Sequence, residues 1–117
     1  MQKVITLIIP ILLFLAACGQ KEGINQLDVF EFQKQIQEEQ AILLDVRTLN
    51  EFKNGHIKNA GQLNYYAMDF KQKLLLLPKD QPIYLYCNTG YRSNRAARIL
   101  KDNAYPQVYN LEHGIMD

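Results

Sequence analysis

The sequence has no tryptophan, two histidines, two cysteines and no block of like charge among its 117 residues. Its 13 basic and 12 acidic residues give a formal net charge of +1, so nucleic acid is not an expected partner. No cysteine and histidine residues have the spacing of zinc ligands, and no metal or cofactor is expected. The length suits one domain, and the hydrophobic fraction of 48% is that of a globular protein.

The N-terminus has the features of an export signal. A positively charged start precedes an almost wholly apolar run at residues 4–15, which two alanines follow. This run is shorter than the about 20 residues of a membrane span, so residues 1–17 are predicted to be a signal peptide. An uncleaved anchor is the alternative interpretation. The ending Leu-Ala-Ala-Cys at residues 15–18 resembles a bacterial lipobox, which implies cleavage before Cys18 and acylation of that residue.

Acylation of Cys18 has consequences for place and for thiol chemistry. It predicts a protein of the bacterial cell envelope, exported and held by lipid on the periplasmic face or at the outer membrane. Residues 18–24 would form a tether, and residues 25–117 the folded domain. Cys87 would then be the single free thiol. Composition alone leaves open whether such a cysteine is reactive or only buried.

The rest of the chain alternates between short apolar runs and amphipathic stretches. This alternation predicts an α/β domain with a mainly parallel sheet, in which sites form at the carboxyl ends of strands. Helical segments are expected at residues 28–38, 50–53, 67–77 and 93–103, and strands at residues 41–46, 62–64, 83–86 and 107–110.

The segment Cys87–Ser93 lies between a predicted strand and a predicted helix. Its backbone N–H groups have no strand partner and are expected to turn toward the sulfur, with Gly90 allowing the left-handed turn. The helix N-terminus and Arg92 add positive charge, so the pKa of Cys87 should fall below its usual value of about 8.5. A thiolate held in this way can attack a sulfane sulfur and form a persulfide.

Two motifs resemble the rhodanese family over residues 25–115. One comprises Leu44-Asp45-Val46-Arg47, Glu51-Phe52, Gly55-His56-Ile57 and Ala60, and the other comprises Cys87-Asn88-Thr89-Gly90-Tyr91-Arg92-Ser93. The resemblance implies a rhodanese fold, with a central, mainly parallel five-stranded sheet flanked by helices on both faces. It also implies a monomeric thiosulfate:cyanide sulfurtransferase with a small-molecule sulfur donor and a thiophilic acceptor. Export of a single domain most resembles the periplasmic, phage-shock-type rhodaneses.

The resemblance also implies roles for single residues. Cys87 is the candidate nucleophile, and residues 88–93 form the substrate-binding loop. Asp45 and Arg47 are expected to support that loop, Asp45 through hydrogen bonds. Arg47 and Glu51, four residues apart, are expected to form an ion pair, and His56 is expected to be structural.

Other interpretations of the loop remain open. Related phosphatases and arsenate reductases place arginine six positions after cysteine, whereas Arg92 is five positions after Cys87, which favours sulfur transfer. A persulfide carrier and a non-catalytic binding module are the remaining alternatives. Tyr91 is expected to line the pocket mouth, and Arg95 could reach the pocket, whereas Arg98 is expected on a solvated face.

The C-terminus departs from the family pattern. The family has a Gly-Gly pair where this sequence has His113-Gly114, and its last helix has no counterpart before Asp117. The C-terminal helix is therefore expected to be truncated.

Overall fold

A computed structural model describes residues 3–4, 23–38 and 40–116. In chain order the elements are β1 (Asn25–Leu27), α1 (Val29–Glu38), β2 (Ile42–Asp45), α2 (Leu49–Lys53), β3 (Gly61–Gln62), α3 (Phe70–Leu74), β4 (Ile83–Tyr86), α4 (Tyr91–Asp102) and β5 (Val108–Leu111). Within these ranges no helix has the length and apolar character to cross a bilayer. The predicted signal peptide and Cys18 lie outside the described residues.

The five strands form one parallel sheet in the order β1-β5-β4-β2-β3. β4 lies at its centre, and all four of its residues are buried. A short, continuous apolar run is typical of a strand covered on both faces, because neither face meets water. The predicted five-stranded parallel sheet is therefore confirmed.

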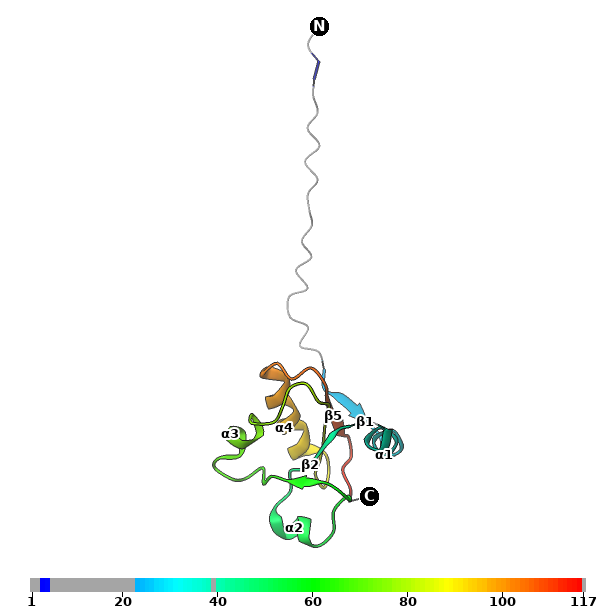
Figure 1. Ribbon diagram of the computed structural model, residues 1–117, viewed down its shortest axis with the longest axis vertical. Helices are drawn as coiled ribbons and strands as arrows, with labels where there is room; N and C mark the ends of the chain where they lie inside the picture. The colour runs from blue at the N-terminus through cyan, green and yellow to red at the C-terminus, as the bar shows by residue number, and fades with distance from the viewer. Residues whose placement is uncertain (1–2, 5–22, 39, 117) are drawn as a thin grey trace.

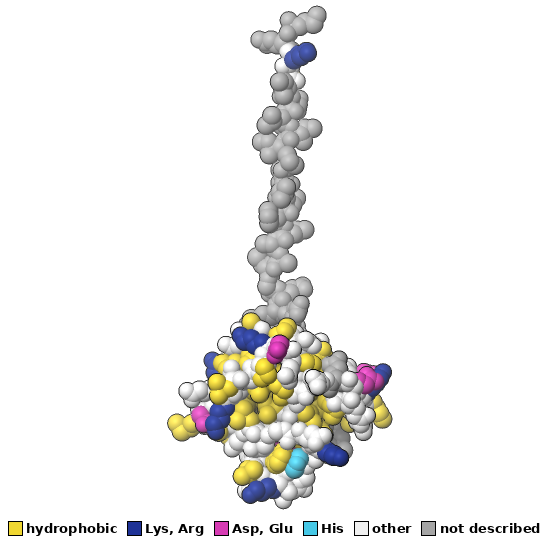
Figure 2. All heavy atoms as spheres, viewed as in Figure 1, with side chains coloured by type: hydrophobic (Ala, Val, Ile, Leu, Met, Phe, Trp, Pro, Cys, Tyr) yellow, Lys and Arg dark blue, Asp and Glu magenta, His cyan; other side chains and the backbone are white. Residues whose placement is uncertain are grey.

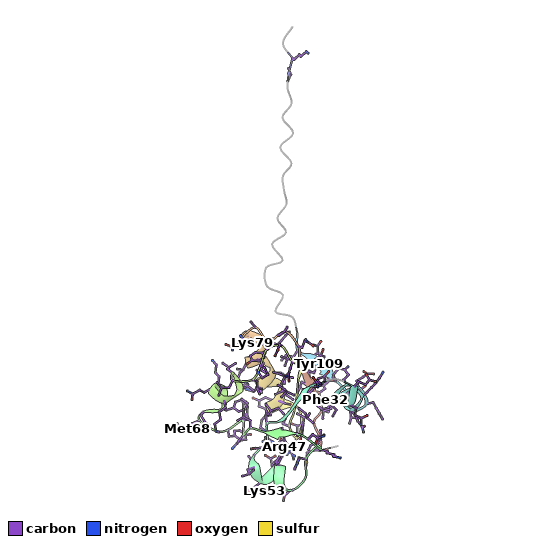
Figure 3. The ribbon with its side chains drawn as sticks, viewed as in Figure 1. Phe32, Arg47, Lys53, Met68, Lys79 and Tyr109 are labelled. Atoms are coloured by element: carbon purple, nitrogen blue, oxygen red, sulfur yellow. The ribbon has the colours of Figure 1, made fainter. Side chains whose placement is uncertain are left out.

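Helices cover both faces of this sheet (Figure 1). On one face Phe32 of α1 packs edge-on against the rings of Tyr84 and Tyr86, at centroid distances of 5.6 and 6.5 Å. On the other face, Leu74 of α3 and Leu100 of α4 are fully buried in the larger core cluster. Burial of each such side chain stabilises the fold by about 1.5–3 kcal/mol. Figure 3 shows Phe32, a residue of α1, on the side of the sheet away from α3.

Several elements are shorter than the sequence predicts, among them the predicted strand 41–46, which is β2 at residues 42–45. The predicted helix 67–77 contains only α3, because its ends close with tighter bonds between residues three apart, from Phe70 N–H to the Ala67 carbonyl and from Leu77 N–H to the Leu74 carbonyl. The predicted strand 62–64 is β3, at residues 61–62.

Two further differences lie at β1 and α4. Sequence patterning missed β1, because its three residues are exposed or half-buried and show no apolar run. α4 starts at Tyr91 rather than Ser93, since Gly90 completes the turn in a left-handed conformation.

The neighbouring strands β2 and β4 are parallel, and their carboxyl ends lie side by side. Asp45 is paired with Tyr86, and the Val46 N–H donates to the Tyr86 carbonyl oxygen at 3.1 Å. The segments that follow, Arg47 and Cys87 among them, therefore start side by side. On the face shown in Figure 2, Lys and Arg side chains lie at separate places, in keeping with the balanced charge.

Candidate active site

The sulfur of Cys87 lies at the floor of the loop that joins β4 to α4, and the residue is 1% exposed. Backbone N–H groups donate to Sγ from Gly90 at 3.2 Å and from Ser93 at 3.5 Å. The Ser93 hydroxyl is a third donor at 3.4 Å. The N-terminus of α4, at Tyr91, directs the positive end of its dipole toward the same loop. The loop N–H groups, the N-terminus of α4 and the Ser93 hydroxyl therefore all present partial positive charge to the sulfur, which favours the thiolate.

The pKa of the Cys87 thiol is lowered by its surroundings. Burial, the largest influence, raises the pKa, because it disfavours the charged thiolate. Hydrogen bonds from the Ser93 hydroxyl and from the N–H groups of Ser93, Thr89 and Gly90 lower it and together outweigh burial. The direction agrees with the expectation from the sequence.

Gly90 is required at its position for two reasons. Its φ of +91° lies in the left-handed region that side chains rarely adopt, and a Cβ would stand 1.9 Å from the carbonyl oxygen of Glu112. Gly90 therefore allows two things: the inward turn of the loop and the close passage of the segment after β5 over that turn.

That C-terminal segment, residues 112–116, also holds the outer side of the loop. The N–H groups of Ile115 and Met116 donate to the carbonyl oxygens of Cys87 and Asn88, each at 3.1 Å. A Cβ on Gly114, whose φ is +71°, would meet the Asn88 carbonyl oxygen at 2.1 Å. With its carbonyl groups bound outward, the loop keeps its N–H groups inward. Sequence reasoning missed this brace, although Gly114 was a signal for it.

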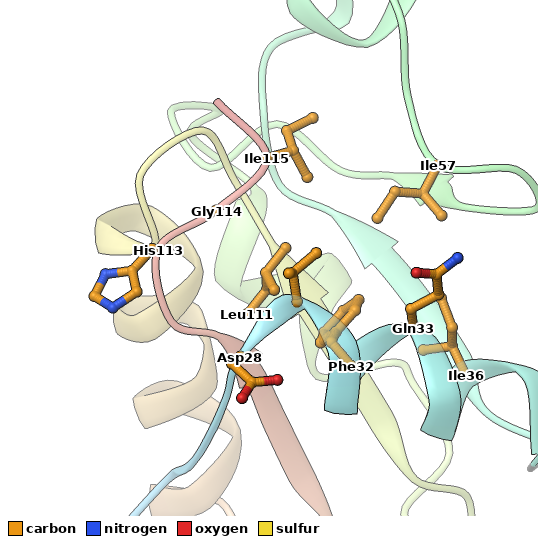
Figure 4. A pocket seen from close by; sticks show the side chains of 10 residues that line it. Asp28, Phe32, Gln33, Ile36, Ile57, Leu111, His113, Gly114 and Ile115 are labelled. Atoms are coloured by element: carbon orange, nitrogen blue, oxygen red, sulfur yellow. The ribbon is translucent and has the colours of Figure 1, made fainter. Parts of the chain in front are cut away.

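The C-terminal segment contains turns and a bend rather than a helix, as expected. The departure at His113 has a simple explanation. Its φ is negative, as is usual for a residue with a side chain, and the side chain is 74% exposed. Figure 4 shows the ring on the outer side of the segment, so a side chain fits where the family has glycine.

Asp45 and Arg47 form a buried pair beside the loop. The Arg47 guanidinium donates to both carboxylate oxygens of Asp45 at 2.8–3.1 Å. Its terminal nitrogens also reach the Asn88 side-chain oxygen at 3.2 Å and the Gly55 carbonyl oxygen at 2.6 Å. Asp45 therefore reaches the loop through Arg47 rather than directly. Figure 3 shows Arg47 at the edge of the sheet that faces α2.

The predicted ion pair between Arg47 and Glu51 is wrong. Arg47 binds Asp45, whereas Glu51 binds Arg92 through two parallel bonds of 2.8 and 2.9 Å. The spacing of four residues misled because Arg47 precedes the first residue of α2, so the two side chains do not share a helical face.

Glu51 links α2 to the loop. It forms a capping box with Thr48 and accepts the side-chain amide of Asn88 at 2.6 Å. Arg92, the main influence, lowers the pKa of Glu51 to about 2, and Glu51 in turn raises the pKa of Arg92. The Arg92 side chain is 12% exposed, so its charge is largely compensated inside the protein. The spacing Thr48-x-x-Glu51 is a capping-box pattern that could have placed Glu51 in the first turn of α2.

Aromatic rings and two arginines form the rim of the loop, which we define as Tyr65, Tyr66, Tyr91, Arg92 and Arg95. The guanidinium of Arg92 lies 5.4 Å from the Tyr66 ring centre, and that of Arg95 lies 5.7 Å from the Tyr91 ring centre. Arg95 also donates to the Tyr65 hydroxyl at 2.8 Å. No sequence motif pointed to Tyr65 or Tyr66.

Thr89, Tyr91 and His56 are all exposed. Thr89 is exposed and contributes its backbone N–H group, and Tyr91 is 65% exposed. His56 is exposed, stacks on Phe52 at 3.6 Å and bonds to the Phe52 carbonyl oxygen at 2.8 Å. Both contacts are local to α2 and the turn that follows it.

An apolar groove of about 430 Å³ lies on the α1 side of the C-terminal segment. Figure 4 shows Phe32 of α1, Ile57 and Ile115 around it. Cys87 does not line this groove, but Ile115, whose N–H donates to the Cys87 carbonyl oxygen, does. The groove therefore lies on the side of the loop that the C-terminal segment covers, and it is not the entrance to the Cys87 sulfur.

Known proteins match this chain over most of its length. The family model of the rhodanese-like domain matches residues 28–117. The uncharacterized protein YqhL of Bacillus subtilis is 43% identical over 74 residues, which cover 63% of this chain and 57% of that protein. A sulfurtransferase of Allochromatium vinosum is 31% identical over 94 residues, which cover 80% of this chain and 86% of that protein.

A solved structure gives the same result. A rhodanese-like domain protein from Staphylococcus aureus matches with a TM-score of 0.68 and 25% identity, over 78% of this chain and 87% of that chain. The chain spans little more than half the length of its Bacillus relative. With a parallel sheet of this order, a glycine-turned cysteine loop and a family model that covers most of its length, the chain belongs to the rhodanese-like domain family.

Proposed function

We propose that this chain is a sulfurtransferase that carries a sulfane sulfur as a persulfide on Cys87. The convergence of the Gly90 N–H, the Ser93 N–H and the Ser93 hydroxyl on Sγ is the observation that supports it most. These donors stabilise a thiolate, and they suit the anionic outer sulfur of a persulfide equally well. Sulfur transfer in general also agrees with the sulfurtransferase among its relatives.

The proposed reaction has two displacement steps and needs no external oxidant. The Cys87 thiolate attacks the outer sulfur of thiosulfate or a similar donor, the donor S–S bond breaks, and sulfite leaves with the electron pair. A thiophilic acceptor, cyanide or a thiol, then attacks the outer sulfur of the persulfide. The bond to Cys87 breaks, and Cys87 leaves as the thiolate that started the cycle.

Phosphatase and arsenate reductase chemistry fits the loop less well. An oxyanion site needs a loop arginine whose charge is available to the oxyanion, and Glu51 compensates the charge of Arg92 through two parallel hydrogen bonds. The step of five residues from Cys87 to Arg92 also makes a smaller ring. Both features favour sulfur as the atom transferred.

Turnover tests this proposal. The full chain, given thiosulfate and cyanide, should form thiocyanate, and Cys87→Ala should abolish the product. Asn94→Ala serves as the control and should keep activity, because Asn94 is an exposed residue of α4 whose side chain bonds to Gln26 and not to the sulfur. A wild type without turnover on cyanide but with a stable persulfide would indicate the alternative function, a persulfide carrier. A wild type that forms no persulfide would indicate a binding module.

We further propose that the protein acts at the cell envelope as a lipid-anchored, periplasmic rhodanese of the phage-shock type. The apolar run at residues 4–15 and the Leu-Ala-Ala-Cys ending at residues 15–18 support this proposal. The full chain expressed in bacteria should incorporate a labelled fatty acid, and Cys18→Ala should abolish the label and keep residues 1–17 attached. Equal labelling of both forms, or no label in the wild type, would contradict the proposal.

A further inference from the structure

The rim of the loop contains one arginine whose charge the described chain does not neutralise. Arg95 is exposed and lies in the second turn of α4. No carboxylate of the described residues forms an ion pair with it. Arg92, one turn earlier, differs because Glu51 takes both of its terminal nitrogens. The available positive charge at the rim is therefore that of Arg95.

Aromatic residues hold this guanidinium in place. Its Nε donates to the Tyr65 hydroxyl at 2.8 Å, and its carbon lies 5.7 Å from the centre of the Tyr91 ring. Tyr65 is itself fixed between Tyr66 and Phe70, at ring distances of 5.4 and 5.3 Å. Because Nε is engaged, the two terminal nitrogens form the end of the side chain, the fork that binds carboxylates.

The depth of the sulfur adds a condition on the donor. Cys87 is 1% exposed at the floor of the loop, whereas Tyr91 at the rim is 65% exposed. A donor that touches both the Cys87 sulfur and Arg95 must carry its transferable sulfur on a slim arm, with its negative group several bonds away from that sulfur. In thiosulfate the negative group is attached directly to the outer sulfur, so it enters the loop with that sulfur.

We propose that Arg95 determines specificity among organic persulfide donors by binding a carboxylate of the donor. This proposal rests on the proposed function. The Cys87 thiolate attacks the terminal sulfur of R–S–SH, the donor S–S bond breaks, and R–S⁻ leaves with the electron pair. The proton stays on the transferred sulfur, so Cys87 ends as Cys–S–SH.

The test compares two donors that differ at their carboxylates, which are free in glutathione persulfide and neutral ethyl esters in the persulfide of glutathione diethyl ester. The measured quantity is the ratio of kcat/KM for the acid to kcat/KM for the ester. Arg95→Gln should lower this ratio about fivefold, the upper end expected for one exposed ion pair. Arg95→Lys keeps the charge and should recover part of the ratio. Arg98→Gln removes the same charge one turn further along α4 and should leave the ratio within about twofold.

The outcomes separate this inference from the proposed function. A wild type that takes sulfur from neither donor nor from thiosulfate would overturn the proposed function and this inference with it. An active wild type whose ratio is unchanged in Arg95→Gln would overturn the inference alone. An equal fall of the ratio in Arg98→Gln would do the same, since a general field and not a contact would then explain the preference.

Discussion

Removal of the Ser93 hydroxyl tests whether the donors around Sγ control the ionisation of Cys87. Ser93 is fully buried, and its hydroxyl is the one side-chain donor to Sγ in the described structure, at 3.4 Å. Ser93→Ala deletes this donor but keeps the backbone N–H that also points at the sulfur. The change removes one atom from a close-packed place, so the fold should remain.

The size of the effect follows from the geometry. A hydrogen bond to a charged group contributes about 1.5–3 kcal/mol. The contact to sulfur is long, and the same hydroxyl lies 3.2 Å from the Gly90 carbonyl oxygen, which competes for its hydrogen. We therefore expect the low end of that range, a loss of about 1.5 kcal/mol of thiolate stabilisation. The pKa of Cys87 rises, and its acid dissociation constant falls about tenfold.

The pH dependence of alkylation by iodoacetamide measures this constant, because only the thiolate reacts. Thr89→Val is the matched control. It removes a hydroxyl from the same loop, but Thr89 contributes its backbone N–H and not its side chain. An alkylation profile that moves equally in both variants, or in neither, would refute the role given to the Ser93 hydroxyl.

Two further substitutions test how the loop is held. Gly90→Ala should lower the free energy of unfolding by about 2 kcal/mol or more, through backbone strain and the contact with the segment after β5. Gly61→Ala, whose Cβ would meet only ordinary contacts at 3.8 Å, should have little effect in the same urea titration. Glu51→Gln should cost about 1–3 kcal/mol because Arg92 loses its partner, whereas Asp69→Asn, which breaks an exposed ion pair, should cost under about 0.5 kcal/mol. The Glu51 pKa is lowered from 4.5 to about 2, so its contribution is complete above pH 4.5 and is lost as the pH falls toward 2. The stability gap between wild type and Glu51→Gln should close over that interval, and a gap independent of pH would contradict the ion pair.

Much of this site could be predicted from local sequence. The apolar runs of β2 and β4 indicated buried parallel strands, and the polar residues after them indicated the edge where a site forms. Cys87 and Gly90 together predicted a loop with inward N–H groups, since the turn depends on neighbouring residues alone. Such features follow from backbone chemistry over a few residues.

The contacts between distant segments could not be predicted in this way. Pairing of Glu51 with Arg92 depends on where α2 crosses the edge of the sheet, and sequence spacing pointed to a different arginine. The hydrogen bond from the Met116 N–H to the Asn88 carbonyl joins residues that only the order of the sheet brings together. β1 has too few residues for a pattern, and its pairing with β5 is set by the rest of the fold.

Intact mass after incubation with thiosulfate tests the central claim most directly. The full chain, freed of excess donor, should gain about 32 Da, the mass of one sulfur atom, and reduction should remove it. Cys87→Ala should show no gain, and the added mass in the wild type should map to the peptide that contains Cys87. A gain of the same size in Cys87→Ala, or none in the wild type with any sulfane donor, would contradict the persulfide on Cys87.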